Sequence, residues 1–294
     1  MALMIRHTIF FVVRLSTQLW GADMNPSETT HWFPADAFGP RTLESPYGWG
    51  LPLNISAHAG AMDQLIVIVH WFSIVLFAGW GIYFLYCLVK FRARPGIQPD
   101  ISHHHFKFPT VLEIGVAVFE VCLLVFLAVP LWAQVKDDFP NESEALVVRV
   151  VAEQFAWNIH YPGRDGKFGK TSIDLMDGTN PIGLDRSDPD AKDDIFTINN
   201  FHVPINKKVI VNLSSKDVIH SFFLPVVRVK LDVVPGLKNR VWFEANQTGT
   251  FEIACAQLCG NSHFRMRGQF FVDTPEAYAA FMAEEEKALA EASQ

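Results

Sequence analysis

Hydrophobic residues form two long runs in the first half of the chain. Residues 65–89 contain no Asp, Glu, Lys or Arg, and this run is longer than the roughly 20 residues that a membrane-spanning helix needs. Residues 111–132 form a second run that is long enough to span a bilayer, and it carries two carboxylates, Glu113 and Glu120. The pattern therefore predicts a two-helix transmembrane hairpin over residues 63–135.

Basic residues between the two runs predict how the hairpin is oriented. The connecting segment carries Lys90, Arg92, Arg94 and Lys107, whereas residues 45–63 contain no Lys or Arg. Because positively charged connections stay in the cytoplasm, both ends of the chain are expected on the outer side of the membrane.

Residues 1–62 then form an outer N-terminal segment that has to be exported. Residues 5–22 have the basic start and the short apolar core of an export signal, but Arg14 interrupts that core. Two alternatives follow, a cleaved signal and a retained anchor.

After the second run, hydrophobic and polar residues alternate in short segments. Alternation with a period of two, bounded by Gly, Pro and Asn, is typical of strands in an antiparallel sandwich or barrel. The pattern predicts an all-β domain over residues 136–274, outside the membrane. The expected strands are residues 145–152, 207–215, 240–245, 250–256 and 268–274.

Two further segments complete the domain organisation. Residues 165–195 form an acidic insertion, with seven Asp between positions 174 and 194, which is too polar to fill a core and is expected on the surface. It is either an unconstrained loop or a negative field that steers a cationic partner. Residues 275–294 follow Thr274, a suitable helix N-cap, and begin with Pro275, so we expect a short amphipathic C-terminal helix.

Composition and charge exclude some classes of function. Half of the residues are hydrophobic and 19% are charged, which is unlike a disordered polypeptide. The formal net charge of -7 provides no basic field for phosphate backbones, so no nucleic-acid partner is expected. Four cysteines are too few for a disulfide-stapled scaffold of this length. Two of them, Cys87 and Cys122, lie in the apolar runs, where we expect inert free thiols.

The other two cysteines belong to a group of soft metal ligands. The segments CAQLCGNSHFRM and DVIHSFFLP supply Cys255, Cys259, His263, Met266 and His220. Thiols, imidazoles and a thioether suit copper far better than magnesium or calcium. A single blue-copper ion needs only one Cys, so the additional thiol indicates two copper ions that share both sulfurs. Each ion would have one imidazole, with Met266 as a weak axial ligand to one ion and a loop carbonyl oxygen available to the other.

Three simpler interpretations compete with copper. Cys255 and Cys259 can form a disulfide outside the cytoplasm, two Cys and two His can bind zinc, and Met266 can be a core residue. None of these accounts for all five residues together, and copper is therefore preferred.

These segments resemble subunit II of haem-copper respiratory oxidases. The resemblance rests on the hairpin, on DVIHSFFLPVVRVKLDVVPGLKNRVWF, on CAQLCGNSHFRM and on the closing EAYAAF, and it covers residue 65 onward except the acidic insertion. It implies a cupredoxin-like Greek-key barrel that holds a binuclear copper centre, CuA. The implied ligands are His220, Cys255, Cys259, His263, Met266 and the backbone carbonyl of Gln257.

The resemblance also implies a respiratory role. Such a subunit accepts single electrons from a cytochrome c, or from a cytochrome-bearing complex, and passes them to haem in subunit I, where oxygen is reduced to water and protons are translocated. It is active only together with that partner, so no catalytic residue is expected in this chain. The implied location is the bacterial inner membrane, in contact with lipid, with the copper domain on the periplasmic side.

Four positions receive a specific interpretation from the resemblance. Gln257 stands where the family usually has a Glu that helps to hold magnesium at the border with subunit I, and an amide is a poorer ligand for that ion, so the magnesium site is left open. Phe155 stands where the family has a Trp for electron input, and Trp157 matches the next aromatic residue; both are candidates for that role. Glu113 matches a glutamate at the mouth of a proton channel, with polar contacts to neighbouring helices as the alternative.

Three related functions are alternatives. The same copper centre serves certain nitric oxide reductases, and the partner subunit decides between the substrates. A membrane-tethered copper-delivery protein would need exposed, exchangeable ligands, and a copper-free quinol-oxidase counterpart would lack the five ligands that this sequence contains.

Overall fold

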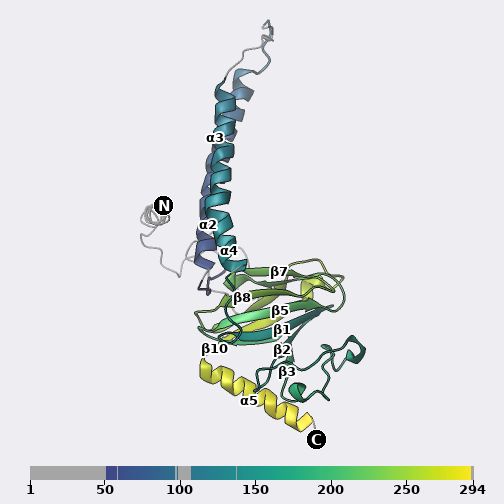
Figure 1. The fold of residues 1–294 in the computed structure, drawn as a ribbon. Helices are drawn as coiled ribbons and strands as arrows, with labels where there is room; N and C mark the ends of the chain where they lie inside the picture. The colour runs from purple at the N-terminus through teal and green to yellow at the C-terminus, as the bar shows by residue number, and fades with distance from the viewer. Residues whose placement is uncertain (1–50, 58, 97, 99–106, 137, 293–294) are drawn as a thin grey trace, which may run out of the picture. The chain divides into compact units, whose positions relative to one another are not determined.

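The first part of the chain that the structure shows consists of two apolar helical runs. The computed structural model describes residues 51–57, 59–96, 98, 107–136 and 138–292 (Figure 1). The first run is α2 (Ala59–Lys90), and the second consists of α3 (Phe108–Leu123), a π-helical stretch (Leu124–Ala128) and α4 (Val129–Lys136). The proposed signal or anchor within residues 1–50 lies outside the described residues.

Both runs meet the length and composition expected of membrane spans. The most apolar 18-residue window has a mean hydropathy of 2.2 within Ala59–Lys90 and of 2.6 within Phe108–Lys136. Large apolar side chains on both runs are exposed, such as Phe77 at 82% and Val111 at 65%. Exposed apolar surface of this extent is costly in water and is normal in contact with lipid or a partner subunit.

A proline explains the change of helix type in the second run. Pro130 has no backbone N–H, and its ring clashes with the carbonyl of the residue four positions earlier. The wider turns of the π-helical stretch Leu124–Ala128, directly before Val129, relieve such a clash while the helix continues to Lys136.

The N-terminal part of α2 is joined to the β-domain by a buried ion pair. Asp63 is fully buried, and its Oδ1 accepts a hydrogen bond of 2.8 Å from Nε of Arg228. The same guanidinium donates to the backbone carbonyls of Pro52 and Pro225, at 2.7 and 2.6 Å. The helix begins at Ala59, before the predicted boundary at residue 63. The ion pair gives the polar Asp63 a partner in the domain.

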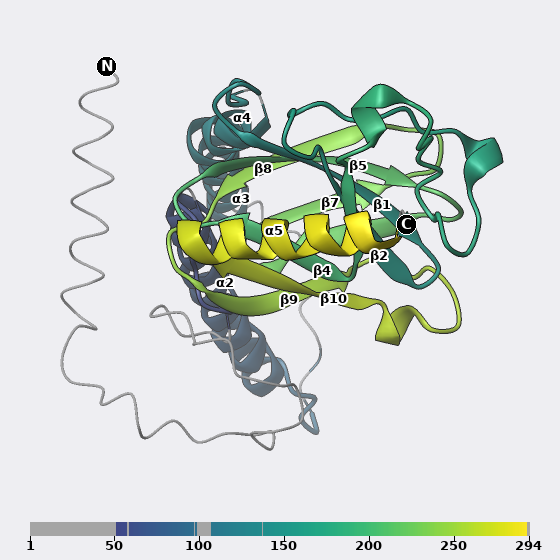
Figure 2. The same ribbon diagram turned by 90° about the horizontal axis from the view of Figure 1, so that it is seen from below.

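Among the described residues, ten strands form two five-stranded sheets. Figures 1 and 2 show how the strands are arranged. Their orders are β3-β2-β1-β5-β8 and β4-β10-β9-β6-β7. The strands are β1 (Leu146–Glu153), β2 (Ala156–Tyr161), β3 (Ile195–Ile198), β4 (Asn200–Pro204), β5 (Lys208–Ser215), β6 (His220–Leu224), β7 (Val229–Val233), β8 (Asn239–Glu244), β9 (Gly249–Cys255) and β10 (Arg267–Asp273).

The five predicted strands are confirmed as β1, β5, β8, β9 and β10, but the pairings of β1 with β5 and of β4 with β10 are parallel, which a pattern typical of antiparallel strands does not predict. β1 pairs with β5 in parallel, with Leu146 opposite Val209, and β10 pairs with β4 in parallel. After β3 the chain crosses to the other sheet for β4 and returns for β5, so β5 runs in the same direction as β1. The alternation of hydrophobic and polar residues within one strand does not predict this crossover.

The core lies between the two sheets and is rich in aromatic rings. Trp157 of β2, Phe222 of β6 and Phe270 of β10 are fully buried. Trp157 packs edge to face on Phe222 with ring centroids 5.4 Å apart, and Phe201 lies 5.4 Å from Phe270. Such aromatic pairs add to the stability that burial alone gives. They support the start of β6, where His220 lies.

The C-terminal helix α5 (Pro275–Ala292) packs on β4 and β10, as Figures 1 and 2 show. Thr274 caps it as predicted, since its Oγ1 accepts a hydrogen bond of 3.2 Å from the backbone N–H of Ala277. Phe281 stacks on the ring of His202 with centroids 3.8 Å apart. The amphipathic helix is thereby fixed to the domain.

The acidic insertion between β2 and β3 is more ordered than its composition predicts. Ile182, Leu184 and Ala191 form a small buried cluster of their own. Asp194 is fully buried, and its Oδ2 accepts hydrogen bonds from Nε2 of His160 at 2.7 Å and from the backbone N–H of Gly169 at 2.8 Å. The segment therefore has a small buried cluster of its own, and some of its carboxylates accept hydrogen bonds that hold the chain in a compact form.

Replacement of Asp194 by alanine is expected to lower the free energy of unfolding by about 3 kcal/mol, because it leaves the buried donors of His160 and Gly169 without an acceptor. The measurement is denaturant unfolding of the purified chain in detergent. Asp174, an exposed carboxylate of the same insertion, provides the control, and Asp174→Ala should change stability by less than about 0.5 kcal/mol. Equal losses in the two variants would contradict the assigned role of the buried pair.

Candidate metal centre

The backbone brings all six predicted ligand residues to one end of the second sheet. β6 begins at His220 and β9 ends at Cys255, and the antiparallel pairing places Phe222 opposite Cys255. The chain then turns through the loop that contains Gln257 and Cys259. It returns through the 3-10 turn His263–Arg265 to Met266, directly before β10.

The donor atoms lie within a few ångströms of one another. Sγ of Cys255 is 3.8 Å from Sγ of Cys259, far beyond the S–S bond of about 2.05 Å in a disulfide. With metal–sulfur bonds of about 2.3 Å, two sulfurs at this distance can bind one ion with an angle of about 110° at the metal. The separation therefore fits thiolates that bridge metal ions.

The remaining donors divide into two groups, one beside each sulfur. Nδ1 of His220 is 4.0 Å from Sγ of Cys255, and the carbonyl oxygen of Gln257 is 3.2 Å from the same atom. Nδ1 of His263 and Sδ of Met266 are each 3.6 Å from Sγ of Cys259. An arrangement with one imidazole and one weak donor at each sulfur fits two ions better than one.

Asp217 orients the first imidazole, and sequence reasoning did not identify it. Nε2–H of the buried His220 donates a hydrogen bond of 2.8 Å to Oδ1 of Asp217, so that Nδ1 faces Cys255. The carboxylate of Asp217 also accepts hydrogen bonds from the backbone N–H groups of Gln154 and Val218, each at 2.7 Å. A fixed outer partner of this kind holds a histidine ligand in the tautomer that binds metal.

The pKa values of His220, Cys255 and Cys259 follow from these contacts. Burial lowers the pKa of His220, but its hydrogen bonds with Cys255 and Asp217 outweigh burial and raise that pKa above its usual value. Burial raises the pKa of Cys255, but the hydrogen bond from His220 and backbone donors lower it to about 6. Burial and the neighbouring charge of Cys255 raise the pKa of Cys259 to about 11. Binding of a metal ion to both sulfurs therefore displaces the Cys259 proton.

The cysteine loop is held in place from β2 and its preceding turn. Nε2 of Gln154 donates a hydrogen bond of 2.6 Å to the carbonyl of Cys259. Gly260 has φ of 140°, and a Cβ atom there would lie 2.7 Å from Nε2 of Gln154 and 3.1 Å from the ring of Phe155. Glycine is therefore required for the close approach of the loop to this turn.

The structure separates the two aromatic candidates for electron input. Phe155 is half-buried and its ring lies close to Gly260 in the loop. Trp157 is fully buried and packs on the ring of His220 with centroids 6.2 Å apart. Two side chains that sequence reasoning missed, Leu258 and Phe264, are 77% and 79% exposed on the same loop region. The roles of the two aromatic residues stay predictions.

The carboxylates of the second helical run lie away from these elements in the sequence and have no assigned partner. Glu113 and Glu120 are both exposed on α3, and within the described ranges neither makes an ion pair. The proton-channel role of Glu113 stays a prediction.

Comparisons of this chain with known proteins agree on one family. The family described as "Cytochrome C oxidase subunit II, periplasmic domain" matches residues 146–269. The "Alternative cytochrome c oxidase subunit 2" of Bradyrhizobium diazoefficiens is 32% identical over 244 residues, which are 83% of this chain and 86% of the relative. The "Cytochrome c oxidase subunit 2" of Alkalihalophilus pseudofirmus is 31% identical over 224 residues, 74% of this chain and 55% of the relative.

A solved structure is similar in sequence to about half of this chain. The crystal structure of the periplasmic domain of subunit II of cytochrome oxidase from Bradyrhizobium japonicum has 30% sequence identity to this chain. The match covers 51% of this chain and 98% of that one, with a TM-score of 0.38.

Proposed function

Because the chain belongs to the cytochrome c oxidase subunit II family, we propose that it is the electron-input subunit of a haem-copper terminal oxidase. Membership makes it a membrane-anchored component of an oxidoreductase complex, with an extracytoplasmic β-domain and copper as the metal of the family. The proposal adds that single electrons pass from a cytochrome c through a binuclear CuA centre to haem in subunit I. Oxygen reduction and coupled proton translocation would then take place in that partner.

The observation that carries the proposal is the pair of thiols 3.8 Å apart, each beside its own imidazole. Zinc would need no Met266, and a disulfide would need a much shorter distance between the sulfurs. His220 and Cys259 are buried, which disfavours a copper-delivery protein with exchangeable ligands. The proposed ligands are His220, Cys255, Cys259, His263, Met266 and the carbonyl of Gln257.

The surrounding residues prepare the site for electron transfer. Bound copper would supply a one-electron redox couple. Trp157 and Phe222 exclude water beneath His220, while Asp217 and Gln154 fix the imidazole and the cysteine loop. A rigid ligand set changes little between two oxidation states, and we propose that this rigidity keeps the reorganisation cost of electron transfer low.

The proposed location is the bacterial inner membrane, with the β-domain on the periplasmic side. The two apolar runs and the basic residues between them support it, since Arg92 and Arg94 lie in the connection. Whether magnesium binds beside Gln257 stays open, because its amide side chain is a poor ligand for that ion.

Electron paramagnetic resonance of the purified full chain loaded with copper tests the proposed centre. A single unpaired electron shared by two copper nuclei should give seven hyperfine lines, together with two copper atoms per chain by metal analysis. Four hyperfine lines, one copper atom per chain, or a colourless protein with oxidised cysteines would overturn the proposal.

A further inference from the structure

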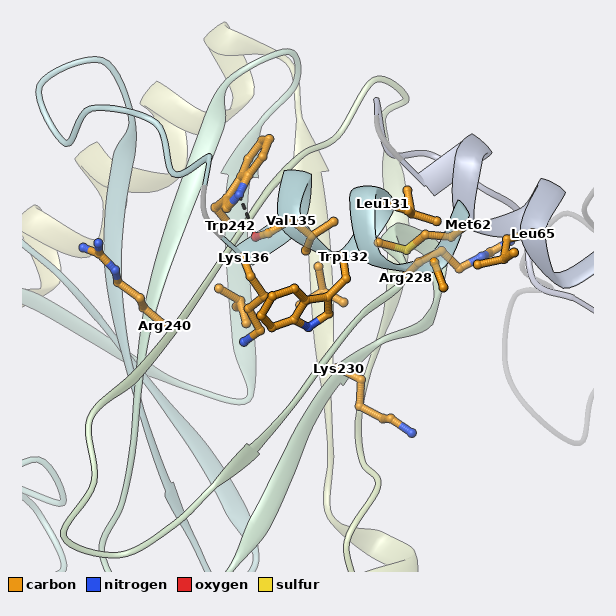
Figure 3. A pocket seen from close by; sticks show the side chains of 13 residues that line it. Met62, Leu65, Leu131, Trp132, Val135, Lys136, Arg228, Lys230, Arg240 and Trp242 are labelled. Carbon is orange, nitrogen blue, oxygen red and sulfur yellow. Dashed lines mark hydrogen bonds between the residues drawn. The ribbon is translucent and has the colours of Figure 1, made fainter. Parts of the chain in front are cut away.

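Two adjoining hollows lie where the end of the second helical run meets β7 and β8. The first has a volume of about 370 Å³ and is lined by α2, α4 and both strands (Figure 3). The second is lined by residues of α4, β7, β8 and the turn between these strands. Lys136 and Arg240 line both hollows, so the two form one continuous surface.

Two contacts define the walls of the first hollow. At one end Arg228 pairs with Asp63. At the other, Nε1–H of Trp242 donates a hydrogen bond of 3.1 Å to the backbone carbonyl of Val135, shown as a dashed line in Figure 3. The hollow therefore includes both the membrane helices and the β-domain in its walls.

The first hollow is mainly apolar and lies at the expected membrane surface. Its apolar lining includes Met62, Leu65, Leu131 and Trp132. Trp132 is the last residue of the apolar run that begins at residue 111, and it is 60% exposed. Tryptophan at the end of a span commonly lies at the level of the lipid headgroups.

The rim of the two hollows carries a positive charge. Lys136, Lys230, Lys238 and Arg240 line them, and among the described residues no Asp or Glu does. Figure 3 shows Trp132 and Lys136 between Arg240 on one side and Lys230 on the other. Arg240 also contacts Glu142 at 3.5 Å. In the part of the chain that the structure describes, Lys136, Lys230 and Lys238 make no ion pair, so most of this positive charge is not neutralised by direct contact with a carboxylate.

An apolar hollow beside uncompensated cations, at the membrane surface, fits a ligand with an acyl chain and an anionic head. We infer that this surface binds an anionic phospholipid. Its chain lies against Leu65, Leu131 and Trp132, and its phosphate lies near Lys136, Lys238 and Arg240. This site is independent of the proposed copper centre, and the lipid would stabilise the junction between the hairpin and the β-domain.

Native mass spectrometry of the full chain tests the inference, after incubation in mixed micelles of equal phosphatidylglycerol and phosphatidylcholine. The wild type should retain phosphatidylglycerol in clear preference. The triple variant Lys136→Gln, Lys238→Gln, Arg240→Gln should lose that preference by about tenfold or more. The matched control, Lys167→Gln, Lys192→Gln, Lys287→Gln, removes three exposed cations of the insertion and α5 and should behave as the wild type. Thermal unfolding of each variant shows whether it is folded.

Four results would overturn the inference. The first is equal retention of the two lipids by the wild type, and the second is unchanged preference in the folded triple variant. The third is displacement of phosphatidylglycerol by millimolar inorganic phosphate, which would mean that the site recognises a free anion. If the wild type retains no lipid and the triple variant alone fails to co-purify with its haem-bearing partner, the occupant is a protein and the lipid inference is wrong.

Discussion

Replacement of Cys259 by serine is expected to abolish the oxidation of cytochrome c by the assembled oxidase. Sγ of Cys259 lies 3.8 Å from Sγ of Cys255 and 3.6 Å from both Nδ1 of His263 and Sδ of Met266, so its loss removes the sulfur that lies between the two donor groups. Loss of an outer partner of a metal ligand typically costs 10–100-fold, and loss of a shared ligand should exceed this. We expect turnover to fall by more than about 100-fold, measured as cytochrome c oxidation by the purified complex.

The chain contains a matched control for this substitution. Cys122 is an exposed free thiol on α3, and Cys122→Ser should leave both turnover and copper content unchanged. A Cys259→Ser complex that keeps two copper atoms and more than about a tenth of the turnover would show that this sulfur is not a shared ligand.

Replacement of Asp63 by alanine is expected to give the largest loss of stability of any single change considered for this chain. Asp63 is fully buried and the Arg228 side chain is 9% exposed, so the substitution leaves a buried guanidinium without its counter-charge. Removing one partner of such a pair costs about 3–5 kcal/mol, which corresponds to a fall in Tm of roughly 10 °C for a domain of this size. Thermal unfolding of the purified chain in detergent, followed by near-ultraviolet circular dichroism, provides the measurement.

An exposed ion pair provides the comparison for Asp63. Lys287 pairs with Glu291 at 3.8 Å on α5, and both side chains are more than two thirds exposed. Exposed pairs contribute about 0–1 kcal/mol, so Lys287→Ala should shift Tm by only a few degrees. Similar shifts for Asp63→Ala and Lys287→Ala would mean that the buried pair does not hold the hairpin to the domain.

The sequence pattern predicted β1 and missed β2, and the burial of the two strands accounts for the difference. β1 alternates between buried and half-buried residues, and its half-buried positions include the polar Arg149 and Glu153. In β2 every residue after Ala156 is buried, including the polar Asn158 and His160. His160 is tolerated there because Asp194, 34 residues later, accepts its hydrogen bond. The pattern of neighbouring residues in β2 does not predict a partner so far away in the sequence.

The candidate site shows the same division. Cys255, Cys259, His263 and Met266 lie within twelve residues, so their spacing alone indicated a soft-metal site. Gln154 was missed because its contact with the cysteine loop connects positions 105 residues apart. Asp217 lies only three residues before His220, and its contact with the imidazole depends on the conformation of the turn before β6. The assignment of one imidazole to each sulfur, and the burial of Trp157 against the partial exposure of Phe155, depend on how β2, β6 and β9 are arranged.

The exposed Leu258 and Phe264 have a consequence for how a redox partner associates with the loop. A protein that covers these two side chains displaces the water around them. The free energy gained by burying this apolar surface does not depend on ionic strength. Charges elsewhere on the surface would then govern how fast the two proteins meet, and dehydration of this small patch would govern how long they stay together. The rate of encounter and the lifetime of the complex would thus depend on separate residues. Repeated turnover with a diffusing electron carrier requires a fast encounter and a short lifetime.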